Sequence, residues 1–171
     1  MKIIGAIFVL FASGGIGFLY ARELMRRNKE IEELCQLLKM ILGDIRYMRA
    51  TLPEAIAKAK KRHGGSYQMF LDEVEEGLQE ANGVTFSQIW DMSVKRGLRT
   101  GALNEEDKQK MIRFGEAISS ADRETIILYF EQYIDELQQI NQELQRTLKD
   151  KVKLYRSLGV MSGIFLVVLF L

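Results

Sequence analysis

Residues suited to metal binding or nucleophilic catalysis are scarce in this sequence of 171 residues. It holds a single cysteine, Cys35, and a single histidine, His63. A zinc site needs several such ligands. A Cys–His catalytic pair would have to use a thiol that lies beside an apolar strip, where thiols behave as small core groups. The sequence therefore predicts neither a metal site nor a nucleophilic cysteine.

Carboxylates and glycines are more numerous, but their positions match no catalytic pattern. The acidic pairs are of the kind that solvated helix faces and first turns carry: Glu32–Glu33, Glu75–Glu76 and Glu105–Glu106. Gly14, Gly15 and Gly17 lie inside an apolar segment, whereas a phosphate-binding loop lies between a strand and a helix. We therefore expect a protein that is not an enzyme and that uses no cofactor.

Composition favours an all-α fold. The chain contains one proline and is 47% hydrophobic, with abundant Leu, Glu, Gln, Lys and Met, which are good helix formers. The formal net charge is +1, whereas nucleic-acid binding normally requires a concentrated positive face. We therefore expect no nucleic-acid partner.

Both ends of the chain are apolar. Residues 3–21 carry no charge, and a helix of that length measures about 28 Å, close to the ~30 Å hydrocarbon core of a bilayer. The uncharged run 157–171 is shorter, at about 22 Å, and residues 154–156 extend it to about 27 Å. We predict an N-terminal transmembrane helix over 1–21, a cytoplasmic helical domain over 22–156 and a C-terminal transmembrane helix over 157–171. The alternative for the first segment is a cleaved signal peptide.

Basic residues flank both apolar segments on the side of the central domain. They are Arg22, Arg26, Arg27 and Lys29 after the first segment, and Lys149, Lys151, Lys153 and Arg156 before the second. Because Lys and Arg accumulate on the cytoplasmic side of membrane spans, the domain is expected in the cytoplasm with both termini outside. The protein would then pass twice through the cell membrane.

Two glycines of the C-terminal segment share a helix face. Gly159 and Gly163 are four residues apart, an arrangement that lets another helix approach closely in a membrane. They predict a packing seam with the first span or with another chain, or they simply reflect the frequency of glycine in membrane helices.

The central domain is expected to contain six helices. Apolar residues recur every three or four positions from Ile31 to Met48, which predicts a long first helix that packs within the chain or forms a dimer. Capping patterns predict helix starts at Thr51, Thr85 and Asn104, and periodicity predicts a third helix over 66–81. The last helix runs from about Asp122 to Arg156 and continues into the second span, as the first helix continues from the first.

A basic cluster, residues 58–63, follows the second predicted helix. A helix C-terminus favours positive charge, and the cluster could equally bind anionic lipid or an acidic partner surface. An anionic-lipid-binding, membrane-anchored regulator is therefore the alternative function.

Several short segments, in this order and spacing, resemble the stage III sporulation protein AB family. They are Met1–Ala6, Ile45–Tyr47, Thr51–Ala55, Arg113–Gly115 with the later Asp122, and Tyr155–Val160. The resemblance covers essentially the whole chain. The sequence departs from the family where Thr51-Leu52-Pro53 replaces Thr-Pro-Leu and where Ile118-Ser119 replaces Leu-Gly.

The resemblance implies a platform subunit of a sporulation channel that links the mother cell to the forespore in an endospore-forming bacterium. It implies a cytoplasmic domain similar to the type II secretion platform protein and a location in the mother cell membrane around the forespore. It also implies two kinds of partner, a secretion-type ATPase and other membrane subunits of the channel, and a homo-oligomer is possible.

Overall fold

The computed structural model describes the backbone of residues 2–80 and 83–170, and the side chains of residues 22–80, 83–150 and 154. Within this described part the chain forms six α-helices and no strands. They are α1 (Lys2–Tyr47), α2 (Leu52–Arg62), α3 (Gln68–Glu80), α4 (Phe86–Gly97), α5 (Glu105–Ile118) and α6 (Arg123–Phe170). The all-α prediction with six helices is confirmed.

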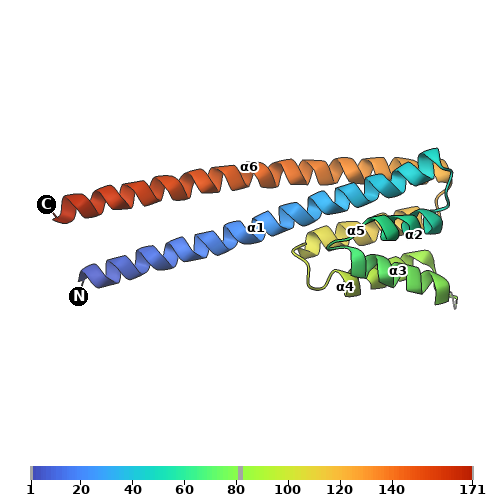
Figure 1. The fold of residues 1–171 in the computed structure, drawn as a ribbon, viewed down its shortest axis with the longest axis horizontal. Coiled ribbons are helices and arrows are strands. Elements are labelled where there is room, and N and C mark those ends of the chain that lie inside the picture. Colours follow the sequence, from blue (N-terminus) through green and yellow to red (C-terminus); the bar gives the residue numbers. More distant parts are fainter. Residues whose placement is uncertain (1, 81–82, 171) are drawn as a thin grey trace.

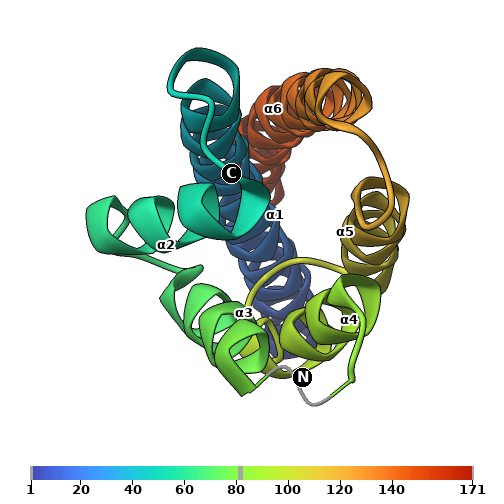
Figure 2. The same ribbon diagram turned by 90° about the vertical axis from the view of Figure 1, so that its right-hand side faces the viewer.

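The two long helices run antiparallel, and the four short helices pack at the end of this pair that lies away from both termini (Figure 1). Each helix contacts the next along the chain, and α6 returns to α1, so that the six helices close a ring (Figure 2). Both chain ends therefore lie at one end of the molecule. The ring end near residues 47–51 and 119–122 is the distal end.

Over the residues whose side chains are described, no helix is long and apolar enough to cross a membrane. The predicted transmembrane segments, 1–21 and 157–171, fall on residues whose side chains lie outside the described ones.

Local capping explains where the short helices begin. The Thr51 N–H donates to Glu54 Oε2 at 2.9 Å at the start of α2, which has Pro53 in its first turn. At the starts of α4 and α5, Thr85 with Gln88 and Asn104 with Asp107 form reciprocal capping boxes. All three predicted starts are confirmed.

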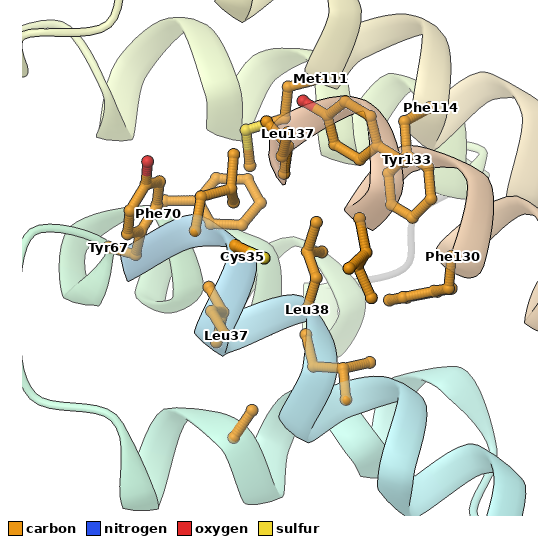
Figure 3. Packing of buried hydrophobic residues seen from close by; sticks show 14 of the residues in the cluster. Cys35, Leu37, Leu38, Tyr67, Phe70, Met111, Phe114, Phe130, Tyr133 and Leu137 are labelled. Atoms are coloured by element: carbon orange, nitrogen blue, oxygen red, sulfur yellow. The ribbon is translucent and has the colours of Figure 1, made fainter. Parts of the chain in front are cut away.

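The apolar strip of α1 faces the inside of the ring. Ile31, Leu34, Leu38, Ile41 and Ile45 are all at most 2% exposed, so the strip packs within the chain rather than forming a dimer seam. Figure 3 shows Leu38 of this strip and the neighbouring Leu37 in the same core as aromatic residues from α3, α5 and α6. The core is thus one hydrophobic cluster that α1 helps to close.

Trp90 is the centre of the aromatic packing. It meets Phe70 of α3 and Phe114 of α5 edge to face, and its Nε1–H donates to the Met111 carbonyl at 2.8 Å. Phe114 in turn packs on Phe130 and Tyr133 of α6. The chain of rings links four of the six helices.

At the distal end, Arg123 of α6 holds the C-terminus of α1. Its Nη2 donates to the carbonyls of Ile45 at 2.8 Å and Arg46 at 3.1 Å, which have no partner within the helix. The chain then reverses through Arg49, whose φ of 53° places it in the left-handed region. The same end of α1 is held a second time by the ion pair of Arg46 with Glu131.

Gly115 provides a test of the Trp90 packing. A Cβ built on it overlaps the Trp90 indole, so we expect Gly115→Ala to destabilise the fold by about 2 kcal/mol through overpacking. Gly43 is also inside a helix but has open space around it, so Gly43→Ala should stabilise by about 0.5–1 kcal/mol through helix propensity. Thermal unfolding of the full-length chain in detergent measures both, and equal signs for the two variants would contradict the packing.

Candidate functional site

One segment of α1, residues 27–33, contacts two of the loops that connect the short helices; we call it the junction segment. Its Arg27 forms a bidentate ion pair with Asp107 of α5, with N–O distances of 2.7 and 2.8 Å. Asp107 is buried, and its carboxylate also accepts the Asn104 N–H at 3.1 Å. One carboxylate therefore caps α5 and ties that helix to α1.

Glu30 holds the loop between α4 and α5. Its Oε2 accepts the N–H groups of Ala102 at 2.7 Å and Leu103 at 3.2 Å, so a side chain from α1 satisfies two loop amides. The Glu30 backbone carbonyl accepts the hydroxyl of Tyr67 at 3.0 Å. Burial raises the pKa of Tyr67 well above its usual value, and the nearby Glu30 charge raises this pKa further.

Glu33 completes the junction segment at the loop between α2 and α3. Its Oε2 accepts the Ser66 N–H at 3.3 Å, and its other oxygen lies 3.7 Å from the Lys29 ammonium. Three charged side chains, spaced every three residues along one helix, thus hold the bundle: Glu30 and Glu33 fix the two loops to α1, and Arg27 fixes the first turn of α5. This arrangement holds no nucleophile next to a base; it ties α1 to the bundle at three positions.

The predicted membrane-flanking residues are only partly covered by the described side chains. Arg22, Arg26 and Lys149 are exposed, whereas Arg27 is turned into the ion pair with Asp107. The side chains of Lys151, Lys153 and Arg156 lie outside the described residues, as do those of the predicted packing pair Gly159 and Gly163.

The two basic flanks nevertheless lie at the same height. Gln138 of α6 contacts Cys35 of α1, and these two helices run antiparallel. Thirteen residues back along α1 leads to Arg22, and thirteen forward along α6 leads to Lys151. The backbone thus brings the flanks level at the end of the bundle that faces the termini.

Cys35 and His63 do not form a pair with each other. Cys35 is buried in the core, where Gln138 Nε2 lies 3.9 Å from its Sγ. His63 packs near Tyr67, with ring centroids 6.3 Å apart. Among the residues described, no three potential ligands are grouped as a metal site would require.

The basic cluster at residues 58–63 is partly neutralised by acidic residues. Lys60 lies 2.8 Å from Asp72 and 2.5 Å from Glu75, and hydrogen bonds to these two carboxylates raise its pKa. Arg62 pairs with Asp44, which is buried on α1. Lys58 and Lys61 remain exposed, so about half of the cluster faces solvent uncompensated.

Sequence reasoning missed the junction segment. The Asn104 capping pattern identified the first turn of α5, but nothing in it indicated that Asp107 also binds a residue 80 positions earlier. Glu33 was assigned to a solvated face. A signal did exist, because Arg27, Glu30 and Glu33 share a helix face with the buried Ile31 and Leu34.

Comparison with known proteins identifies the family. The family model for Stage III sporulation protein AB matches residues 2–171. The chain is 22% identical over 173 residues to Stage III sporulation protein AB of Bacillus subtilis (strain 168), covering 99% of this chain and 98% of that protein. A solved structure of Stage III sporulation protein AB matches with a TM-score of 0.64 and 18% identity, covering 72% of this chain and 97% of that one. At this identity the structural match supports the fold, and the resemblance predicted from sequence is confirmed.

Arg27 and its neighbour Arg26 offer a matched test of the junction segment. We expect Arg27→Ala to lower the free energy of unfolding by about 3 kcal/mol, because it leaves the Asp107 carboxylate buried without its cation. Arg26→Ala removes the same charge from an exposed side chain 3.9 Å from Glu23 and should cost less than about 0.5 kcal/mol. Thermal unfolding of the full-length variants in detergent measures the difference; similar losses would rule out this role for Arg27.

Two buried tyrosines should respond differently to loss of the hydroxyl. Tyr67→Phe loses the bond to Glu30 and should cost about 1 kcal/mol. The Tyr133 hydroxyl is buried without a partner among the described residues, so we expect Tyr133→Phe to be neutral or stabilising.

Stability should also fall at alkaline pH. Burial raises the pKa of Tyr133, as do the charges of Glu136 and Asp107, so the folded state keeps its proton above pH 10 while the unfolded state loses it. The free energy of unfolding should therefore decrease as pH rises past about 10, and Tyr133→Phe should decrease less steeply. Urea titrations at pH 9 to 11 give the free energy of unfolding at each pH. If this free energy fell equally steeply with pH in Tyr133→Phe and in the wild type, the prediction would be contradicted.

Proposed function

The chain belongs to the stage III sporulation protein AB family and has a role in sporulation, and from that premise we propose that it is a non-enzymatic platform subunit of a secretion-like channel complex. In this role it couples a cytoplasmic ATPase to the membrane part of the channel during endospore formation. The bundle is the part that the ATPase moves or holds, and the two long helices carry that displacement to the membrane.

The observation that carries this proposal is the junction segment. It lies on α1, which continues without a break from Lys2 to Tyr47. It fixes the α2–α3 and α4–α5 loops and the first turn of α5 to this helix. α6 is likewise continuous from Arg123 to Phe170. A continuous helix transmits a displacement, whereas a flexible linker of the same length absorbs it.

The same geometry supports our proposal for the placement of the protein in the cell. Both termini lie at one end of the molecule and the two basic flanks are level, which supports a bundle held on one side of a bilayer by two apolar tails. We place this bundle in the cytoplasm, with the tails in the mother cell membrane around the forespore. Its partners are a secretion-type ATPase and other membrane subunits of the channel.

The alternative function, an anionic-lipid-binding regulator, has less support. Lys60 and Arg62 are engaged by carboxylates of the chain itself, which leaves Lys58, Lys61 and the flanking residues for headgroups. The alternative would be favoured if the central domain, within the full-length chain, bound phosphatidylglycerol vesicles and lost this binding at moderate salt.

Interrupting α1 tests the coupling. We expect a Gly-Ser-Gly-Gly insertion after Glu23 to leave the bundle folded and the ATPase bound, but to reduce heat-resistant spores by at least about tenfold, because the helix no longer transmits force. The same insertion after Ser120, in the exposed connection between α5 and α6, is the control and should sporulate like wild type.

Three outcomes separate the parts of the proposal. Normal sporulation of the Glu23 insertion would contradict mechanical coupling. Failure to recover the ATPase by crosslinking in membranes that contain the wild-type chain would remove the proposed partner. ATP hydrolysis by the purified full-length chain would contradict a non-enzymatic role.

A further inference from the structure

A groove runs along the outer seam between α1 and α6. Its volume is about 410 Å³, and it is lined by Lys39, Leu42, Glu131, Gln132, Ile134 and Asp135. α2 and α5 lie on the far sides of α1 and α6, so no other helix covers this edge of the ring (Figure 2). The groove is therefore open to a partner.

The walls of the groove carry opposite charges at the same height. Lys39 on α1 and Asp135 on α6 are both exposed, and neither forms an ion pair with any described residue. Cys35 of α1 lies beside Gln138 of α6, and the two helices are antiparallel. Four residues forward along α1 and four residues back along α6 therefore bring Lys39 level with Ile134, next to Asp135. One uncompensated cation therefore faces one uncompensated anion across an apolar floor of Leu42 and Ile134.

The same face of α1 is open above Lys39. Gly43 lies one turn further along, and a Cβ built there meets nothing within 4 Å. One turn beyond it, Tyr47 is 81% exposed, and Leu128 on the facing helix is 50% exposed. A partner that covers the groove and this face of α1 would bury both apolar side chains.

We propose that this groove binds a second copy of the chain, through a two-fold axis that runs parallel to α1 and α6. A two-fold interface must be self-complementary, so that each residue contact occurs twice. With this axis, Lys39 of each copy meets Asp135 of the other, because the two side chains lie on opposite walls at one height. The small Gly43 allows α6 of the other copy to approach α1 closely.

This inference goes beyond the proposed platform function and does not depend on it. The axis leaves all four termini at one end of the dimer, so both copies can insert in one membrane if the apolar tails do so. Homodimerisation would place two bundles side by side on the cytoplasmic face, and a dimer could also form if the protein had another role in sporulation.

Charge exchange tests the pairing. In sedimentation of the full-length chain in detergent micelles, the wild type should form a concentration-dependent dimer. Lys39→Glu and Asp135→Lys should each raise the dimer dissociation constant by about tenfold or more, because two pairs become repulsive. The combined variant, with both charges exchanged, should return to within about threefold of wild type.

A steric probe gives a second, independent result. Gly43→Arg adds a long side chain in open space, so the chain should fold normally by circular dichroism yet lose the dimer. Gly64→Arg adds the same side chain at another open glycine, away from the groove, and should dimerise like wild type. A monomeric wild type at all concentrations, undiminished dimerisation of the folded Gly43→Arg variant, or no rescue by the combined exchange would each overturn the proposal.

Discussion

The structure depends on one constraint: α1 must close the hydrophobic core of the bundle while continuing as a single helix toward the N-terminus. Burial of its apolar strip supplies most of the driving force, but hydrophobic contact is not directional and would tolerate a shift of the helix along its axis. The junction segment removes this freedom. Arg27, Glu30 and Glu33 each require a defined partner on the bundle, so their contacts fix the height of α1. At the distal end, Arg123 and Glu131 do the same from α6.

Much of this fold could be predicted from the sequence because its signals are local. The three-and-four spacing of apolar residues indicated each helix, and the pair Thr85 with Gln88 and the cap residue Asn104 marked where two of them begin. The contacts of the junction segment could not be predicted in this way. A charged residue on a helix looks the same in sequence whether it faces solvent or a loop 70 to 80 residues away. Arg27 illustrates this, since the sequence predicts it as one of several equivalent flanking cations, and it binds a buried carboxylate.

The basic residues show why charge patterns need a structure before they become functional arguments. The run from Lys58 to His63 is the densest positive segment of the chain, yet Lys60 and Arg62 neutralise acidic residues of α3 and α1. Lys39 is isolated in the sequence and matches no predicted site, but with Asp135 it frames the open groove. Whether a charged side chain is already paired within the chain, and not how many charges cluster in the sequence, decides which charges can meet a partner.

The closed ring has a consequence for synthesis of the chain. The contact between Cys35 and Gln138 joins residues 103 positions apart, so it can form only after nearly the whole bundle has left the ribosome. Until then the inner face of α1 has no α6 to cover it. The apolar strip of α1 therefore stays at least partly exposed during most of translation. In that period a chaperone or the membrane-insertion machinery can bind the nascent chain.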